Sequence, residues 1–417
     1  MTISDKAAEQ AALDLLADVL KKAKEAGADA ADAIVAESVS LGVSWRMGKP
    51  EDVERSESRD LGLRVFIGQQ QAFVATSVTD NDARIELARR AVAMAKAAPA
   101  DKFCGLGDPA LMARDFADLD LADMAEPNVE ALYERARTAE GACMAVPGVT
   151  NSEGASASYG RGRTAFATSH GFAGGFTGSR HGVSASAIAG SGTAMEADSD
   201  YGSTRHLSDL PDAAAIGKSA GERAVKRLNP KKLPSTAVPV IFAPRIAGSL
   251  LGHLAGAISG AAVARGTSFL KDKMGQAIFS PGVTVIDDPF RPRGLRSRPF
   301  DGEGGQSQRR RLIDAGRLTT WLLDSATGRQ LGLASTGNAS RGTGGPPGPA
   351  PTNLYMEPGQ LSPDELIADI REGFYVTDLI GFGVKTIADM LYAHQVITSE
   401  ETFGELNNVC WLSLIHI

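Results

Sequence analysis

The sequence predicts an α+β fold of two domains, with antiparallel sheets and helices packed against them. The chain has 417 residues, which is more than one hydrophobic core usually serves. Helical and two-residue periodicities occur in separate groups, whereas a parallel βαβ array would alternate them. The stretch LNPKKLPSTAVP at 228–239 interrupts both periodicities. We therefore expect an N-terminal α+β domain over 1–232 and a strand-rich C-terminal domain over 233–384.

The N-terminal domain is predicted to begin with a helix over 4–26, because Leu13, Leu16 and Leu20 recur at helical spacing. The period then changes to two between Val39 and Met47, which indicates a strand. A hairpin and further elements follow. The hairpin is expected over 63–75, helices over 81–98, 129–145 and 211–228, and short strands rich in Gly, Ser, Ala and Thr over 149–188.

The C-terminal domain is predicted to contain strands separated by turns. Residues 238–242 form a short apolar strand, and 311–323 form a hairpin that turns at 314–316, where Gly316 can adopt a left-handed conformation. The segment RGTGGPPGPAP at 341–351 is a loop, since its prolines exclude a helix or a central strand.

Composition excludes several classes of protein. The net charge of −7 disfavours nucleic acid as a partner, because phosphate binding needs clustered Lys and Arg. The short run Arg309-Arg310-Arg311 is interpreted as a solvated strand face. No stretch of about 18 apolar residues predicts a membrane span, and the N-terminus lacks a secretory pattern. Three isolated cysteines are typical of a reducing compartment. We expect a cytoplasmic protein.

The sequence contains no P-loop motif. The pairs Asp287-Asp288 and Asp301…Glu303 could in principle act as acid and base. Each pair adjoins Pro or Gly, however, so we interpret them as turn residues.

The histidines do not form a metal-binding pattern. A zinc hydrolase needs about three protein ligands, commonly histidines, and a carboxylate base. No two histidines here stand four or five residues apart, and none is close to a cysteine. Spacing alone therefore indicates that His253, within LLGHLAGA at 250–257, lies on a packing helix. The six histidines are His170, His181, His206, His253, His394 and His416.

Several blocks of the chain, in this order and spacing, resemble one known family. They are PVIFAPRIAGSLLGHLAGAISG at 239–260, FLKDKMGQAI at 269–278, the segment 298–339, and TNLYMEPG at 352–359. Between about residues 28 and 383 the chain is similar to the TldD/PmbA family of modular zinc metallopeptidases, long described as modulators of DNA gyrase. The resemblance is to the PmbA (TldE) branch.

The resemblance implies a subunit without its own metal site. In the TldD branch, the segment equivalent to 250–257 carries a His-Glu-x-x-x-His zinc motif. Its histidines fall at Gly252 and Ala257, and its glutamate falls at His253. The family pattern thus implies a non-catalytic chain with no cofactor. It implies a heterodimer with a TldD-like catalytic subunit, which holds the zinc, around a cavity for peptide substrates.

The resemblance also suggests where peptide contacts this chain. The TldD branch carries a similar Thr-Asn-x-Tyr-Met block near its cleft, which corresponds here to Thr352, Asn353, Tyr355 and Met356. An extended segment can hold a peptide by main-chain hydrogen bonds and so accept varied side chains. The alternative is an ordinary core strand, because periodicity does not distinguish the two.

The end of the chain departs from the family. After Gly381-Phe382-Gly383-Val384 the family continues with a Gly-Asp-Tyr-Ser-Arg-Gly block, whereas residues 385–417 match nothing in that pattern. We therefore expect an incomplete C-terminal domain, and Cys410 is not assigned the role of the family's late cysteine.

Two other functions stay open. One is a metallopeptidase active alone, with ligands from His170, His181 or His206; the other is a non-enzymatic regulator of DNA gyrase or of a toxin–antitoxin pair.

Overall fold

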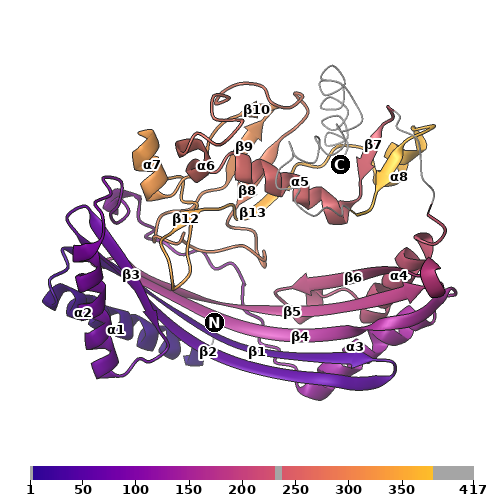
Figure 1. The fold of residues 1–417 in the computed structure, drawn as a ribbon, viewed down its shortest axis with the longest axis horizontal. Helices are drawn as coiled ribbons and strands as arrows, with labels where there is room; N and C mark the ends of the chain where they lie inside the picture. Colours follow the sequence, from indigo (N-terminus) through magenta and orange to yellow (C-terminus); the bar gives the residue numbers. More distant parts are fainter. Residues whose placement is uncertain (1–2, 231–236, 379–417) are drawn as a thin grey trace. The chain divides into compact units, whose positions relative to one another are not determined.

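The computed structural model describes residues 3–230 and 237–378, in two compact units. Unit 1 contains residues 1–232 together with two later segments, Phe290–Phe300 and Arg341–Pro346. Unit 2 contains the remainder of the chain. Both units combine helices with sheets that are almost entirely antiparallel, so the predicted α+β class is confirmed (Figure 1).

A six-stranded antiparallel sheet forms the centre of unit 1, in the order β3-β2-β1-β4-β5-β6. The region 149–188 holds two long strands of 20 and 17 residues, so the prediction of short strands there was wrong. The strands are β1 (Ala30–Arg46), β2 (Lys49–Ile67), β3 (Gln70–Thr76), β4 (Val149–Thr168), β5 (Ala173–Ala189) and β6 (Glu196–Thr204).

The turn between β1 and β2 is a two-residue turn at Met47 and Gly48. Both residues have positive φ, 49° and 76°, as the hairpin turn that suits strand twist requires. The buried Glu140 carboxylate accepts hydrogen bonds from both backbone N–H groups, at 2.7 and 2.9 Å. A side chain from a helix therefore fixes the conformation of this turn.

Four helices of unit 1 cover one face of the sheet and agree with the predicted helices to within about two residues at each end. They are α1 (Ile3–Glu25), α2 (Asn81–Ala97), α3 (Val129–Met144) and α4 (Ala213–Lys226). Asp80, Asn128 and Asp212 cap the last three, each side chain accepting a hydrogen bond from the backbone N–H three residues later.

The four helices cover two separate parts of this face. Alternate residues of β1 share a face, and Ala31, Ala33 and Val35 join the core with α1 and α2. Leu41 and Val43, further along the same face, join a second core with α3 and α4. Figure 1 shows α1 and α2 near one end of the long strands and α3 and α4 near the other. The middle of the face, around residues 37–39, belongs to neither core.

The opposite face of the sheet carries an aromatic cluster at one end. Phe166 of β4 packs with Phe172, and both contact the core around Phe300, which belongs to the first late segment of unit 1. No pattern in the sequence predicts that residues near 300 complete this core.

Unit 2 is made of shorter elements around its own apolar core. Its main sheet has four strands in the order β10-β9-β8-β13, β11 pairs with β12, and β14 pairs with β7 in parallel. The predicted strand at 238–242 and hairpin at 311–323 are present as β7 and as β9-β10. The strands are β7 (Val240–Phe242), β8 (Val285–Asp288), β9 (Arg310–Asp314), β10 (Arg317–Leu318), β11 (Ala339–Ser340), β12 (Gly348–Pro349), β13 (Asn353–Met356) and β14 (Phe374–Val376). The helices are α5 (Pro244–Ala257), α6 (Gly260–Ala264), α7 (Ser325–Leu331) and α8 (Pro363–Ala368).

The predicted tail at 385–417 and part of the linker, 231–236, lie outside the described residues. Within the residues described, no helix has the length and apolar character needed to cross a membrane.

Candidate functional site

Helix α5 carries Gly252, His253 and Ala257, the positions that the family resemblance assigns to the zinc motif of the TldD branch. It begins at Pro244, which suits the first helical turn because its missing N–H would be unpaired there. Ile246, Leu250 and Leu254 bury one side of the helix in the core of unit 2. Gly252 is exposed, His253 is half-buried, and Ala257 is buried at 8% exposure.

The residues of α5 do not fit a zinc ion. Gly252 and Ala257 have no donor atom, and His253 alone offers one nitrogen where the motif needs two histidines and a carboxylate base. A Cβ added at Gly252 would meet no heavy atom within 4 Å, so the position has space but no ligand. Among the described residues, no group of three or more His, Cys, Asp or Glu side chains is placed to hold a metal ion.

Strand β13 contains the second set of candidate residues, and it lies at the edge of the four-stranded sheet. It pairs with β8 on one side, and within the described chain no strand pairs with its other side. Helix α5 packs against β13. The structure therefore brings together the two segments that the sequence analysis singled out.

The two faces of β13 differ as the alternation of its residues predicts. Leu354 and Met356 pack against the core of unit 2. On the other face, Asn353 donates from Nδ2 to the Asp288 carbonyl at 2.6 Å, and the Tyr355 hydroxyl accepts from Arg309 at 3.3 Å. Thr352 precedes the strand and is only 3% exposed.

The register of β13 shows which backbone groups point to its open edge. The Glu357 N–H donates to the Thr284 carbonyl at 2.9 Å, which is the hydrogen-bonded type of antiparallel pair. Hydrogen-bonded and non-hydrogen-bonded pairs alternate along an antiparallel ladder. Every second residue from 357, namely 355 and 353, therefore also directs its backbone N–H and C=O groups to β8. The N–H and C=O groups of Leu354 and Met356 therefore point away from β8, toward the open edge.

Asp287 is a buried strand residue, so its interpretation as a turn residue was wrong. It lies at the end of β8 with 1% exposure. Its carboxylate accepts from the Thr352 N–H at 2.6 Å, the Thr352 hydroxyl at 2.8 Å and Asn338 Nδ2 at 2.7 Å. These bonds satisfy the buried carboxylate and fix the start of β13. Sequence reasoning missed this role because the adjacent Asp288-Pro289 pair indicated a turn.

The predictions for the pair Asp301 and Glu303 and for the arginine run at 309–311 are confirmed only in part. Asp301 is a turn residue as predicted: its carboxylate accepts from the N–H groups of Glu303 and Gly305. Glu303 is buried and accepts from the Ser325 N–H at the start of α7. Arg309 and Arg311 are half-exposed, which agrees with a solvated strand face, whereas burial lowers the pKa of Arg310.

Within unit 1, two of the described histidines interact with residues of the same unit. His181 is fully buried with Nε2 3.1 Å from an Asp123 oxygen, and His206 Nε2 lies 2.9 Å from the Asp120 carbonyl oxygen. Burial lowers the pKa of His181, and this effect exceeds the opposing one of Asp123. His170 is exposed, and His394 and His416 lie outside the described residues.

Comparison with known proteins identifies the family. Models of the three PmbA/TldA metallopeptidase domains match in order: domain 1 at residues 31–95, the central domain at 122–228 and the C-terminal domain at 235–392. The chain is 36% identical to the metalloprotease PmbA of Escherichia coli O157:H7 over 86% of this chain and 78% of that protein. It is 35% identical to the PmbA homologue of Haemophilus influenzae over 92% and 83%.

Solved structures show the same fold. A protein of Bacteroides thetaiotaomicron described as a putative modulator of DNA gyrase superposes with a TM-score of 0.81 at 24% identity, covering 88% of this chain and 82% of that one. TldE from Thermococcus kodakarensis superposes at 0.76 and 22%, covering 88% and 83%. The fold and sequence thus define a chain of the metallopeptidase class. It belongs to the PmbA/TldD family, as its sequence blocks predicted.

Proposed function

We propose that this chain is the non-catalytic subunit of a cytoplasmic TldD/TldE-type zinc metallopeptidase, and that it pairs with a TldD-like subunit that carries the zinc. The observation behind this proposal is the chemistry of α5. The helix keeps the position and the family context of the zinc motif, but Gly252, His253 and Ala257 supply neither two ligands nor a base.

The open edge of β13 supports a peptide as the substrate. Leu354 and Met356 direct their backbone N–H and C=O groups to this edge, where an extended peptide could add as a further strand. Main-chain bonds do not depend on the peptide's side chains. In this proposal Thr352, Asn353, Tyr355 and Met356 belong to the wall of the peptide cleft. Thr352 fixes the start of the strand through Asp287, Asn353 lies on the face away from the core of unit 2, and Tyr355 presents its ring beside Arg309.

Co-expression with the TldD-like protein of the same cell tests the proposal. The two chains should elute together from a size-exclusion column, and zinc should copurify with the pair but not with this chain alone. Peptidase activity on an unstructured peptide should appear only in the pair. Zinc and activity in this chain alone would show that it is a metallopeptidase in its own right, and a pull-down returning gyrase without a TldD-like chain would favour the regulator.

A further inference from the structure

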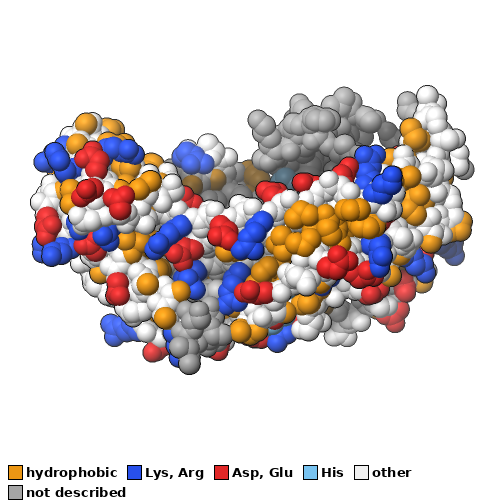
Figure 2. Space-filling view, turned by 90° about the horizontal axis from the view of Figure 1, so that it is seen from below, with side chains coloured by type: hydrophobic (Ala, Val, Ile, Leu, Met, Phe, Trp, Pro, Cys, Tyr) orange, Lys and Arg blue, Asp and Glu red, His pale blue; other side chains and the backbone are white. Residues whose placement is uncertain are grey.

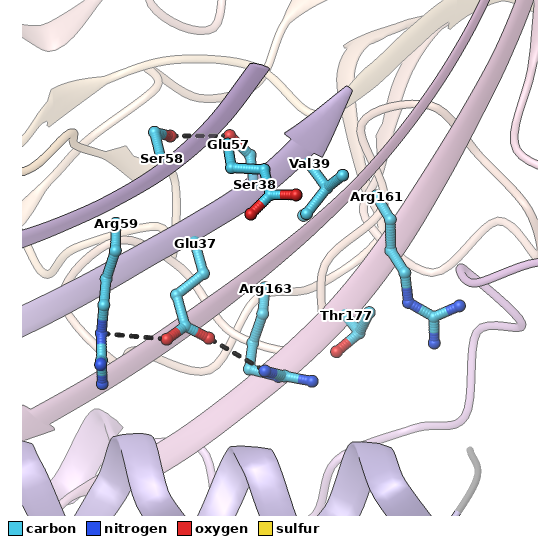
Figure 3. Close-up of a pocket in the computed structure, with 10 residues that line it drawn as sticks. Glu37, Ser38, Val39, Glu57, Ser58, Arg59, Arg161, Arg163 and Thr177 are labelled. Carbon is cyan, nitrogen blue, oxygen red and sulfur yellow. Dashed lines mark hydrogen bonds and ion pairs between the residues drawn. The ribbon is translucent and has the colours of Figure 1, made fainter. Parts of the chain in front are cut away.

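The arginines on the helix-covered face of the unit 1 sheet are balanced by carboxylates. A pocket of about 410 Å³ lies on this face and is lined by residues of β1, β2, β4 and β5. In it, the two oxygens of Glu37 lie 3.1 Å from Arg59 Nε and 2.9 Å from Arg163 Nη1 (Figure 3). Figure 2 shows Lys and Arg side chains beside Asp and Glu side chains across this face.

The same balance holds along three whole strands. Every arginine of β1, β2 and β4 has a carboxylate oxygen at 3.9 Å or less, and these arginines are Arg46, Arg55, Arg59, Arg64, Arg161 and Arg163. An arginine of the sheet that lacks such a partner is therefore an exception.

Arg180 of β5 is this exception. Val183 joins the core under α3 and α4, so the alternate residues Gly178, Arg180 and Gly182 lie on the opposite face of the sheet. Arg180 is exposed and donates from Nε to the Ser203 hydroxyl at 2.7 Å. Within the described parts of the chain, no carboxylate pairs with Arg180 and no acceptor bonds its Nη groups. Its charge and its two terminal nitrogens are therefore available to a ligand.

A second guanidinium group lies beside Arg180. Arg205 follows β6, and three of its N–H groups donate to backbone carbonyls, at 3.2, 3.3 and 2.8 Å for Ser179, Gly294 and Leu295. These acceptors are neutral, and among the described residues no carboxylate pairs with Arg205. Burial and then the nearby charge of Arg180 lower the pKa of Arg205. A guanidinium has five N–H groups, so two remain for a ligand.

Small residues surround the two guanidinium groups. A Cβ at Gly178 would lie 2.4 Å from Arg205 Nη1, so glycine is what lets this group lie against the sheet. The β4 residues paired with positions 178, 180 and 182 have small side chains or none, and they are Gly162, Gly160 and Ser158. An extended chain can therefore lie flat on this part of the face.

The ligand that fits these features is a carboxylate at the end of an extended chain. Two neighbouring positive charges repel each other, and an anion bound to both offsets the repulsion. A planar carboxylate accepts two parallel N–H bonds from one guanidinium group. The C-terminus of a peptide supplies this anion, and its backbone can extend over the small residues beside Arg180.

We propose that Arg180 and Arg205 form a binding site for the C-terminal carboxylate of a peptide. Arg180 supplies its two Nη groups, and Arg205 supplies a second positive charge and its remaining N–H groups. The site belongs entirely to unit 1. The choice of a peptide as the source of the carboxylate rests on the proposed peptidase function, whereas the anion site rests on the two arginines alone.

Isothermal titration calorimetry of the full chain with N-acetyl-tri-alanine tests the proposal. The peptide should bind, and C-amidation should weaken binding about tenfold, as expected for the loss of a charge-assisted hydrogen bond. Arg180→Gln should weaken binding of the free acid by a similar factor. Amidation should then cause no further loss, because both changes remove the same ion pair. Arg180 is exposed, so this variant should fold.

A second arginine of similar exposure provides the matched control. Arg137 on α3 is 59% exposed and pairs with Glu134, so Arg137→Gln changes the net charge equally and should bind the peptide like the unaltered chain. Arg205→Gln should weaken binding of the free acid, with its circular dichroism spectrum confirming the fold.

Three results would overturn the proposal. They are equal binding of the acid and the amide, equal binding of acetate or of inorganic phosphate, and unchanged binding by Arg180→Gln. Because binding is measured on this chain alone, failure to pair with a TldD-like subunit would count against the proposed function and leave this result unaffected.

Discussion

Asp32 and Arg341 form a fully buried ion pair although they lie 309 residues apart in the sequence. Asp32 is on β1, and Arg341 begins the second late segment of unit 1. Arg64 of β2 donates to the same carboxylate, and the Arg341 guanidinium also lies over the Phe166 ring at 5.5 Å. One carboxylate thus balances two buried guanidinium groups.

Asp32→Asn is expected to destabilise the protein strongly. It removes the carboxylate that both buried guanidinium groups contact, and breaking a buried ion pair in this way costs about 3–5 kcal/mol. The free energy of unfolding in urea measures the loss. Glu25→Gln is the matched control, because the Lys21–Glu25 pair is exposed at 3.8 Å and such pairs contribute at most about 1 kcal/mol. Equal losses in the two variants would contradict the role of Asp32.

The Asp32 carboxyl should also make stability depend on acid pH. Burial alone would raise its pKa, but Arg64 and Arg341 outweigh burial and hold the pKa below the ordinary value. The stabilisation is therefore present above the unfolded-state pKa of about 3.9 and is lost as pH falls through the folded-state value. Urea titrations between about pH 5 and pH 2 should show a steeper decline for the unaltered chain than for Asp32→Asn. Parallel declines would show that other carboxyls govern this range.

Gly62→Ala should displace the segment Arg341–Pro346. A Cβ at Gly62 would lie 2.2 Å from the Thr343 carbonyl oxygen and 2.8 Å from its Cα, and backbone atoms of this kind cannot move aside alone. We expect a loss of about 1–3 kcal/mol, as for other overpacked positions, and faster amide exchange in 341–346. Gly42→Ala on β1 is the control, since its Cβ would meet nothing within 4 Å. Similar exchange rates in both variants would argue against the contact.

Restoring the motif by Gly252→His, His253→Glu and Ala257→His should produce weak zinc binding with little peptidase activity. Space exists at Gly252, but Ala257 is buried, and the described residues contain no group of three or more His, Cys, Asp or Glu side chains placed to hold a metal ion. Metal analysis of the dialysed variant and a peptide cleavage assay measure the two properties. Turnover close to that of a TldD-like enzyme would show that the rest of a catalytic site is present in this chain.

Asn353→Ala and Tyr355→Ala should lower peptide cleavage by the reconstituted heterodimer, with little change in pairing or thermal stability. Both residues lie on the face of β13 away from the core of unit 2. Leu354→Ala is the contrasting variant, because it removes a core contact and should lower the melting temperature. If Asn353→Ala and Tyr355→Ala lose stability and keep normal specific activity, β13 is a core strand and the cleft assignment fails.

The sequence predicts those features that depend on local pattern. The alternation from Val39 to Val43 and the helical spacing of Leu13, Leu16 and Leu20 predict their elements because each pattern reflects one buried face. Motif alignment likewise locates α5 and β13. That β13 is an edge strand depends on the order of strands in the sheet, which periodicity does not contain.

The positions of the buried charged residues could not be predicted from the sequence. Asp32, Arg64 and Arg341 are buried, against the usual exposure of these side chains, and only their pairing in three dimensions accounts for it. The pocket beside Glu37 is equally invisible in the sequence, because Glu37 and Arg163, which line it, are brought together only by the register of β1 and β4.

The late segments of unit 1 have a consequence for biosynthesis. The strands of the unit 1 sheet are translated long before Phe300 and Arg341. Until those residues are made, the aromatic cluster lacks Phe300 and the buried ion-pair network lacks Arg341. We therefore expect that the two units do not fold one after the other in order of synthesis, which is the usual course for multidomain proteins. The first unit can complete its core only after residues up to 346 have been translated.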